Sequence, residues 1–288
     1  MTQQYETYGR LRGRVAVVTG GTKGIGQGVV LRFLKEGASV VYCSRNPSNN
    51  AENAALIEEL GAAQRSQFVA ADVGSKSDMQ GLVAAAAERF GRVDILVNNA
   101  QGIAPLNPIQ SKPDGDYSMT LATGFFHSLW TSQAALPHMQ AQRYGRIIHM
   151  SSVWSLWGYR YGSDYAVTKG ALESLTRSMA NEWGKFGVTV NCVRPAGDSF
   201  AYKQFKAQDI RTAAESEAAI PMGRMGDCEV EIAGAILGLV SENGRFITGQ
   251  VLNVDGGLWA VPPNHEPASD VDIHRGRAQA AVSVGEGN

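Results

Sequence analysis

The sequence is poor in cysteine. Its 288 residues include only three, Cys43, Cys192 and Cys228, and no two of them have the spacing of a redox pair. Such a small, odd set excludes a disulfide scaffold and favours reduced, buried thiols. The five histidines are scattered too, so we expect no metal site.

An excess of charge of one sign is also missing. The 26 Lys and Arg residues nearly balance the 27 Asp and Glu residues, for a net charge of −1. Nucleic acids and anionic membranes normally require a basic surface, so we expect neither as a partner. No apolar run approaches the roughly 20 residues of a membrane-spanning helix, and residues 1–14 lack a signal-peptide core. We expect a cytoplasmic protein that acts on a small-molecule substrate.

Short β-branched runs alternate with stretches of helical periodicity along the chain. Most of the runs are nearly continuously apolar rather than alternating, which is typical of parallel strands buried on both faces. The runs lie at 14–18, 39–43, 67–70, 93–97, 146–150, 188–193 and 251–254, and helical periodicity is clearest at 25–36, 78–90 and 165–183. This alternation predicts an α/β fold: a single-domain doubly wound parallel sheet, or Rossmann fold, of about seven strands with helices on both faces.

The rhythm of strands and helices defines the expected domain. It runs without a break over about 11–260, after a polar N-terminal extension at 1–10. At about 196–221 the strand pattern gives way to polar, helical sequence, which predicts a mobile lid over the substrate. Residues 261–288 are rich in Pro, Ala, Ser, Gly and charge, so we expect a tail that is disordered or is ordered only against a partner subunit.

A glycine-rich turn joins the first expected strand to the first expected helix. It reads Thr19-Gly20-Gly21-Thr22-Lys23-Gly24-Ile25-Gly26. Glycine lets the backbone turn tightly and approach a pyrophosphate at the positive end of the helix dipole. The spacing differs from the usual Gly-x-Gly-x-x-Gly, and a tight strand–helix joint alone could also use glycine.

Tyr165 and Lys169 are candidates for acid–base chemistry. They are four residues apart on an expected helix and therefore share one face. An ammonium beside a phenol favours the phenolate, so we expect the pKa of Tyr165 to fall below its usual value near 10. Ser152, at the end of the fifth strand, can donate a hydrogen bond to a developing alkoxide, and the adjacent Ser151 is the fallback.

Together with Asn98-Asn99-Ala100, Asn191-x-x-x-Pro195 and the segment 249–257, these motifs resemble the short-chain dehydrogenase/reductase family over nearly the whole chain. The resemblance implies hydride transfer between nicotinamide and a carbonyl or secondary alcohol carbon. Tyr165 would be the general acid/base, Ser152 would stabilise the alkoxide, and Lys169 would also hold the nicotinamide ribose. It further implies a homo-oligomer, dimer or tetramer, paired through the helices at about 115–140 and 163–184.

The end of the second strand bears on the choice of cofactor. It reads Ser44-Arg45 with no acidic residue, whereas an acid there would repel a 2′-phosphate. The Arg45 guanidinium suits a phosphate, and Lys23 adds a second cation, so we expect NADP(H) rather than NAD(H). Asp72 resembles the family's adenine-contacting acid, although it could equally cap a helix. The expected cofactor-binding residues are Thr19, Gly20, Thr22, Lys23, Gly24, Ile25, Gly26, Ser44, Arg45, Asp72, Val73, Asn99, Ala100, Tyr165, Lys169 and Pro195.

Three positions depart from the family's pattern. Gly124 stands where the family has a fourth catalytic residue, an asparagine that kinks its helix and holds a water. Gln101 replaces the glycine of Asn-Asn-Ala-Gly, and Ala196 replaces the glycine after Pro195. His127 could substitute for the asparagine, or it is simply packed.

Aromatic side chains gather in the sequence near the expected catalytic residues. Flat rings there would suit a bulky cyclic or aromatic ketone, and they could equally pack at a subunit interface. The rings are Trp154, Trp157, Tyr159 and Tyr161, with Phe125, Phe126 and Trp130. We expect Gln101, Trp154 and Tyr159 to contact the substrate. The alternatives to a ketone reductase are an NADP-binding sensor or scaffold, and a dehydratase, epimerase or enoyl reductase on the same fold.

Overall fold

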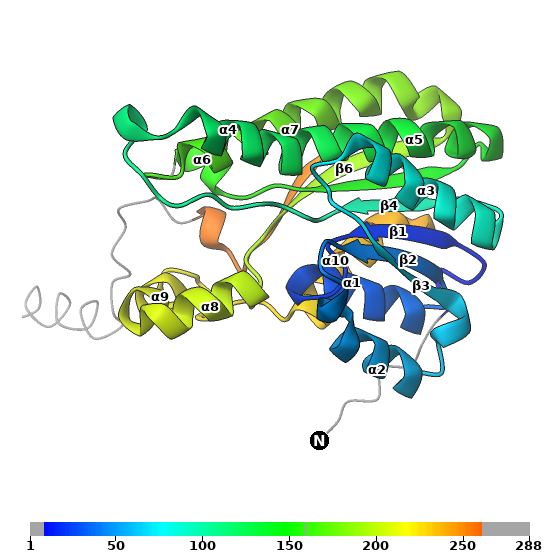
Figure 1. Cartoon of the computed structure of the whole chain (residues 1–288), viewed down its shortest axis with the longest axis horizontal. Coiled ribbons are helices and arrows are strands. Elements are labelled where there is room, and N and C mark those ends of the chain that lie inside the picture. Colours follow the sequence, from blue (N-terminus) through cyan, green and yellow to red (C-terminus); the bar gives the residue numbers. More distant parts are fainter. Residues whose placement is uncertain (1–8, 159, 261–288) are drawn as a thin grey trace, which may run out of the picture.

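One parallel sheet forms the centre of the molecule. The structure is a computed structural model that describes residues 9–158 and 160–260. Seven strands pair in the order β3-β2-β1-β4-β5-β6-β7, as Figure 1 shows. They are β1 Val15–Thr19, β2 Ser39–Ser44, β3 Ser66–Ala70, β4 Ile95–Asn98, β5 Gly145–Met150, β6 Val188–Pro195 and β7 Val251–Val254. The strand order reverses between β1 and β4, the point at which such sheets bind ligands. The predicted fold class is confirmed.

Helices cover both faces of this sheet (Figure 1). One layer consists of α1 Gly24–Lys35, α2 Ala51–Glu59 and α10 Ala233–Val240, and the other of α3 Lys76–Phe90, α5 His127–Gln142 and α7 Ser163–Trp183. Shorter helices lie in the connections: α4 Asp114–Leu121, α6 Trp154–Trp157, α8 Phe200–Gln208 and α9 Ile210–Ala218. None of the described helices combines the length and apolarity that a bilayer-spanning segment requires.

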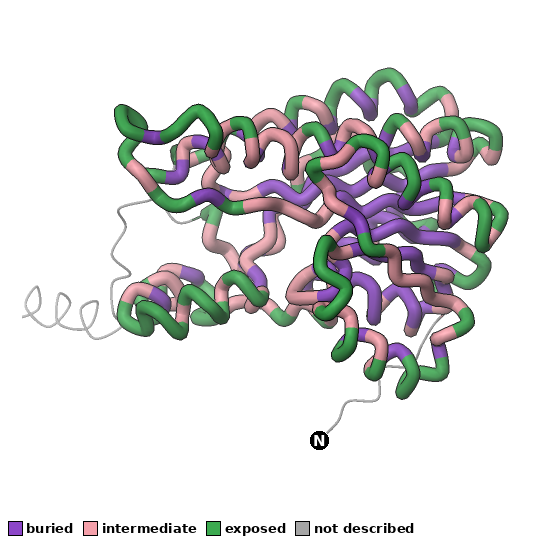
Figure 2. The backbone as a smooth tube through the Cα atoms, viewed as in Figure 1, coloured by how far each residue is buried: buried purple, intermediate pink, exposed green. Residues whose placement is uncertain are grey.

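The apolar core has two halves, one on each side of the sheet. On β1, Ala16 and Val18 belong to the half beneath α1 and α10, while Val15 and Val17 belong to the half beneath α3, α5 and α7. This division follows from the pleat, because successive side chains of a strand point to opposite faces. Figure 2 shows the central strands as the most continuously buried part of the chain. The nearly continuous apolar runs in the sequence reflect this burial on both faces.

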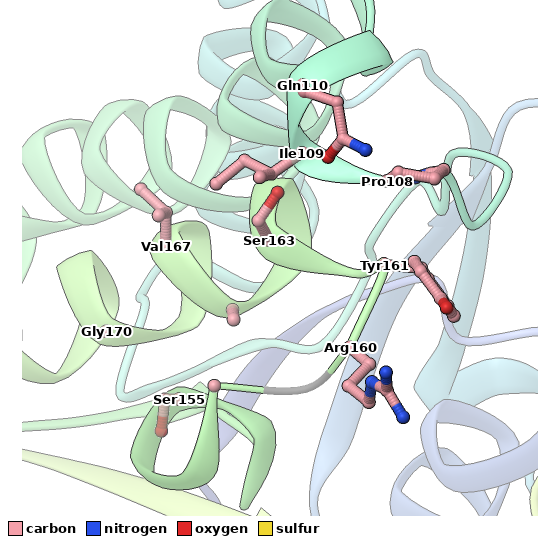
Figure 3. Close-up of a pocket in the computed structure, with 11 residues that line it drawn as sticks. Pro108, Ile109, Gln110, Ser155, Arg160, Tyr161, Ser163, Val167 and Gly170 are labelled. Atoms are coloured by element: carbon pink, nitrogen blue, oxygen red, sulfur yellow. The ribbon is translucent and has the colours of Figure 1, made fainter.

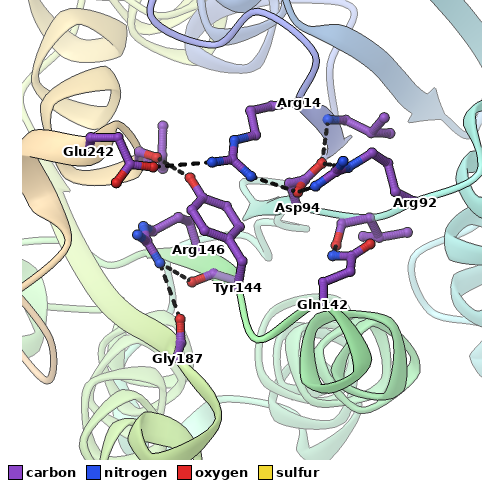
Figure 4. A network of polar contacts seen from close by, with 12 residues as sticks. Arg14, Arg92, Asp94, Gln142, Tyr144, Arg146, Gly187 and Glu242 are labelled. Atoms are coloured by element: carbon purple, nitrogen blue, oxygen red, sulfur yellow. Dashed lines mark hydrogen bonds and ion pairs between the residues drawn. The ribbon is translucent and has the colours of Figure 1, made fainter.

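A polar network fastens the amino ends of the strands, away from the ligand-binding edge (Figure 4). The buried carboxylate of Asp94 pairs with Arg92 at 2.6 Å and with Arg14 at 3.4 Å. The ring of Tyr144 lies between two guanidinium groups, 3.6 Å from that of Arg14 and 4.1 Å from that of Arg146. These contacts join β1, the start of β4 and β5.

The chain after β6 forms two helices, α8 and α9, within residues 196–221, and a role of this segment as a lid remains a prediction. Its helices α8 and α9 are largely exposed and lie at the same end of the molecule as α4 and α6 (Figures 1 and 2). The first turn of α8 rests on the glycine turn, where an added Cβ at Gly24 would come within 2.9 Å of the Phe200 nitrogen. The predicted tail at 261–288, and most of the predicted N-terminal extension, lie outside the described residues.

Candidate active site

The glycine turn presents the amino end of α1 to the carboxyl edge of the sheet. Gly20 and Gly24 have positive φ angles of 65° and 55°. At Gly26, an added Cβ would lie 2.1 Å from the Gly20 carbonyl oxygen, so only glycine fits. The N-cap residue, Lys23, makes no side-chain capping bond, and the first turn contains no acidic residue. The first backbone N–H groups of α1 are thus available to an anion, and the turn fits a pyrophosphate.

Thr19 acts inside this turn as a support. Its hydroxyl oxygen accepts hydrogen bonds from Asn99 N at 3.0 Å and from Ala100 N at 3.1 Å. With both lone pairs engaged, the hydroxyl must donate its own hydrogen to His127 Nε2, 3.2 Å away. Thr19 therefore holds the ends of β1 and β4 together, and its buried hydroxyl is used internally.

His127 is a packed residue, one of the two alternatives that the sequence left open. It is 1% exposed, and burial lowers its pKa to about 3, which keeps the imidazole neutral. Because Nε2 accepts from Thr19, the ring proton resides on Nδ1. His127 therefore supports the glycine turn from α5.

The edge next to β2 has the cationic character that the sequence predicted. Arg45 is exposed and forms no ion pair with any described residue, while Ser44 donates to the Asn46 carbonyl at 3.0 Å. Lys23 lies over the ring of Phe200, with its Nζ 4.4 Å from the ring centroid. Lys23 stands in the connection that follows β1, and Arg45 in the connection that follows β2.

Asp72 does not cap a helix. Its Oδ1 accepts from Gly74 N at 2.8 Å, which closes a turn after β3. The N-cap of α3 is instead Ser75, whose hydroxyl accepts from Asp78 N. The neighbouring Val73 is half-buried and packs against the core. A contact of Asp72 with adenine remains a prediction.

The structure brings Ser152, Tyr165 and Lys169 together at the carboxyl edge. Tyr165 and Lys169 share one face of α7, and the Lys169 Nζ lies 5.1 Å from the Tyr165 ring centroid. The Ser152 side chain lies near the Tyr165 phenol and lowers its pKa. Trp154 packs edge-on against the Tyr165 ring with the centroids 5.3 Å apart. A proton donor, a second hydroxyl and a cation thus converge at the ends of β5 and α7.

The pKa of Tyr165 corrects one expectation. Burial raises it to about 12, and the nearby Ser152 side chain only partly opposes that shift. Burial also lowers the pKa of Lys169 to about 8. The ammonium lies beside the ring and donates to the Met150 carbonyl at 2.6 Å, so it does not offset the desolvation of the phenol. Without a ligand, the phenol is therefore neutral and is poised to donate a proton.

Ser151 has a structural role, which leaves Ser152 as the candidate serine of the site. The Ser151 hydroxyl donates to Glu173 Oε1 at 2.6 Å, and Ser155 donates to the same oxygen. Glu173 also forms a buried ion pair with Arg194 at 2.6 Å. This brace ties α7 to β5 and β6 directly behind Lys169. Sequence reasoning missed it; the one available signal was an acid four residues after Lys169 on the same helical face.

Gly124 lies in a π-helical turn, Ala122–Phe126, between α4 and α5. An added Cβ there would come within 2.3 Å of Gln101 Oε1 and 2.4 Å of Thr168 Cγ2. The side chain of Gln101, from the loop after β4, thus occupies the space next to Gly124. Two of the three departures from the family's pattern are therefore in direct contact.

An apolar wall adjoins the Tyr165 ring. An added Cβ at Gly162 would lie 3.2 Å from Trp154 and 3.5 Å from Leu106, so these two side chains converge there. Tyr159, which we expected to contact the substrate, lies outside the described residues. The Lys112 ammonium holds the loop after β4 in place through an ion pair with Asp164 at 2.6 Å.

A separate pocket of about 740 Å³ lies against α7 (Figure 3). Its walls include Ile109, Tyr161, Ala166, Val167 and Gly170. The last three occupy the face of α7 opposite to the one that carries the catalytic pair. This pocket therefore does not open onto the Tyr165 hydroxyl.

Comparison with known proteins identifies the family. The family model described as Enoyl-(Acyl carrier protein) reductase matches residues 20–259, most of the chain. The chain belongs to the short-chain dehydrogenase/reductase family. This short-chain dehydrogenase/reductase is thus an oxidoreductase that interconverts CH–OH and C=O groups, and its family uses nicotinamide cofactors.

Several characterised proteins resemble this short-chain dehydrogenase/reductase. The 2,3-dihydroxy-2,3-dihydro-p-cumate dehydrogenase of Pseudomonas putida is 37% identical over 251 residues, which cover 86% of this chain and 95% of the relative. L-fucose dehydrogenase of Oryctolagus cuniculus is 35% identical over 261 residues, which cover 88% and 89%. The crystal structure of levodione reductase has a TM-score of 0.82 at 26% identity and covers 87% of this chain and 99% of its own. ElxO with NADP bound has a TM-score of 0.79 at 28% identity, with coverages of 86% and 99%.

Proposed function

We propose that this enzyme is an NADP(H)-dependent oxidoreductase that transfers a hydride between nicotinamide and the carbonyl or secondary alcohol carbon of a bulky cyclic or aromatic compound. The observation that carries the proposal is the convergence of Ser152, Tyr165 and Lys169 beside the uncapped amino end of α1. The proton-transfer groups and the anion-binding turn thus lie at one edge of the sheet, on either side of the point where the strand order reverses.

The cofactor would lie along this edge. The backbone of Gly24, Ile25 and Gly26 would hold the pyrophosphate, and Arg45 with Lys23 would hold the 2′-phosphate. Asn99, Ala100 and Pro195 would border the nicotinamide half, where Lys169 would hold the ribose. Bound there, nicotinamide supplies or accepts the hydride. The binding of NADP by the similar ElxO supports the preference for NADP(H).

Tyr165 would transfer the proton. In reduction its neutral phenol donates to the substrate oxygen as that oxygen becomes an alkoxide, and Ser152 donates a hydrogen bond to the same atom. In oxidation the phenolate would remove the hydroxyl proton. The pKa of Tyr165 is raised to about 12, so at neutral pH the phenol carries the proton that reduction requires.

The substrate class follows from the walls of the site. Trp154 packs against the Tyr165 ring and Leu106 lies near Trp154 at Gly162, so these flat and apolar side chains suit a ring-shaped substrate. Two similar proteins are named for ring compounds, a p-cumate dihydrodiol and levodione. We also propose a homo-oligomer in which two exposed apolar residues, Phe126 of the π-helical turn before α5 and Val167 of α7, are covered.

Kinetics on a substrate panel tests this function. NADPH consumption is measured with cyclic and aromatic ketones, and NADP reduction with the corresponding alcohols and dihydrodiols. In a Tyr165→Phe variant we expect kcat to fall by roughly 10²–10⁴-fold with the affinity for NADPH unchanged, because general acid–base catalysis alone is removed. Activity that survived this substitution would exclude Tyr165 as the proton donor, and turnover with NAD(H) alone would refute the cofactor assignment.

A further inference from the structure

Gly21 joins the glycine turn to the connection that carries Arg45. Its N–H donates to the Cys43 carbonyl, near the end of β2, at 3.0 Å. Its own carbonyl oxygen accepts from the side chain of Asn53 on α2, whose Nδ2 lies 3.2 Å away. An added Cβ at Gly21 would lie 2.7 Å from Tyr42 Cβ, so only glycine fits there. The connection between β2 and α2 is therefore attached to the turn through the segments at both of its ends.

Asn53 occupies a position at which an apolar residue would normally pack. It is 0% exposed and, with Ile57 one turn later, forms the buried part of α2. Ile57 packs into the apolar core, as a buried helix position normally does. A buried amide instead requires a hydrogen-bond partner, and a flipped amide would set Oδ1 against the Gly21 carbonyl oxygen, so Nδ2 faces it. This position of α2 thus serves a polar contact with the glycine turn.

Lys23 and Arg45, the two cations that would hold the 2′-phosphate, belong to different segments. Lys23 follows Gly21 by two residues within the turn, whereas Arg45 directly follows β2. Neither cation forms an ion pair with another described residue that would fix its place. The Tyr42 hydroxyl donates to Asn50 Oδ1 at 2.9 Å, which ties the start of α2 to β2 and makes the Arg45 connection one unit with both. The distance between the two cations therefore depends on how this unit is held at Gly21.

We propose that Asn53 determines cofactor specificity, because its hydrogen bond to Gly21 sets the spacing at which Lys23 and Arg45 both reach one 2′-phosphate. This proposal rests on the proposed function. Since Asn53 is fully buried, it acts through the two connections and is a positioning residue. Without its amide, α2 is released from the turn, and the two cations no longer converge on the same phosphate oxygens. A cofactor that lacks the 2′-phosphate does not depend on this spacing.

Asn53→Leu tests this role, because leucine keeps the approximate volume of the side chain and removes the amide. The Kd values for NADPH and NADH are measured by fluorescence titration, and the Tm is recorded in parallel. We expect the Kd for NADPH to rise about tenfold, as for the loss of one hydrogen bond to a charged group, and the Kd for NADH to stay within about twofold. Asn53→Ala, which removes the amide without adding bulk, should change the ratio of the two Kd values in the same direction. A merely structural role would weaken both cofactors equally, so an unchanged ratio in the two variants overturns the proposal.

Gln142→Leu is the matched control. The Gln142 Nε2 donates to the Val93 carbonyl at 2.9 Å, so this variant also loses a bond from a side-chain amide to a backbone carbonyl, but at the amino edge of the sheet (Figure 4). It should lower the Tm and leave the ratio of Kd values unchanged. A change in the ratio as large as that of Asn53→Leu would overturn the proposal, because general loosening of the fold would then explain both.

A double-mutant cycle with Arg45→Ala gives the second test. In the Arg45→Ala background, Asn53→Leu should raise the Kd for NADPH by less than about twofold, because no second cation remains to be misplaced. If the two losses simply multiply, Asn53 does not act through Arg45 and the proposal is overturned. A wild-type protein that binds NADPH no more tightly than NADH would instead refute the cofactor assignment itself, and this result is read on the unmodified chain.

Discussion

Lys112 and Asp164 form a buried ion pair whose disruption should be strongly destabilising. Their side chains are 0% and 2% exposed, and the ammonium nitrogen lies 2.6 Å from the carboxylate oxygen. The Lys112 ammonium also donates to the carbonyls of Pro105 at 2.8 Å and Tyr161 at 3.3 Å. Lys112→Met removes the cation and leaves a carboxylate with no compensating charge in its interior position. We expect a loss of about 3–5 kcal/mol in the free energy of unfolding.

Urea unfolding followed by tryptophan fluorescence and circular dichroism measures this loss. The matched variant is Lys112→Met/Asp164→Asn, in which the remaining side chain is neutral. It should recover more than half of the lost stability, because the penalty arises from the buried charge and not from the missing packing. Since Asp164 directly precedes Tyr165, the single variant should also lower kcat/KM. A Lys112→Met protein within about 1 kcal/mol of the wild type, or a double variant no more stable than the single one, would refute this reasoning.

Three further perturbations address Arg45, the buried histidines and the glycine turn. Arg45→Asp should shift the ratio of kcat/KM for NADPH over NADH toward NADH by roughly 10–100-fold, because it removes a phosphate partner and adds a repelling charge; an unchanged ratio would exclude Arg45 from the site. Burial lowers the pKa values of His127 and His149 to about 3, so below pH 6.5 the unfolded chain binds more protons than the folded one. The free energy of unfolding should therefore decline as the pH falls from 6.5 toward 3, by up to about 1.4 kcal/mol per pH unit for each histidine. In urea titrations at several pH values, His127→Gln should make this dependence on pH less steep. An unaltered dependence would contradict the burial argument. Gly26→Ala should weaken NADPH binding at least tenfold in a fluorescence titration, because its Cβ would lie 2.1 Å from a carbonyl oxygen of the turn. The control Gly81→Ala, in a helix with open space around it, should leave binding intact and stabilise by about 0.5–1 kcal/mol, so equal effects of the two changes would refute the steric reading.

The sequence predicted the sheet well because burial on both faces leaves a strong signal. Runs such as 93–97 and 188–193 are mostly apolar and β-branched, and each overlaps an observed strand, β4 or β6. The glycine turn was equally easy to recognise in the sequence, because a backbone that reverses within a few residues restricts the side chains it can carry. Tyr165 and Lys169 shared a face because their spacing matches one helical turn.

Contacts between segments distant in sequence were not predictable in the same way. Lys112 stands in a polar loop and Asp164 near the start of a helix, and nothing in either neighbourhood indicates a buried pair. The contact between Gln101 and Gly124 likewise depends on how a loop folds back onto a π-helical turn. The pKa of Tyr165 was predicted in the wrong direction because burial, which raises it, can be judged only from the packed structure.

The contacts around Asp94 and Tyr144 mean that the amino edge of the sheet stabilises the fold, whereas the carboxyl edge carries the candidate site. Charged groups clamp the amino edge, while the carboxyl edge keeps its backbone donors and hydroxyls for ligands. A substitution at the clamped edge should therefore change how much folded enzyme a cell retains, while each surviving molecule works at its normal speed. A loss-of-activity screen that finds variants at this edge would detect a smaller amount of folded enzyme. Lower temperature or saturating cofactor should raise that amount again.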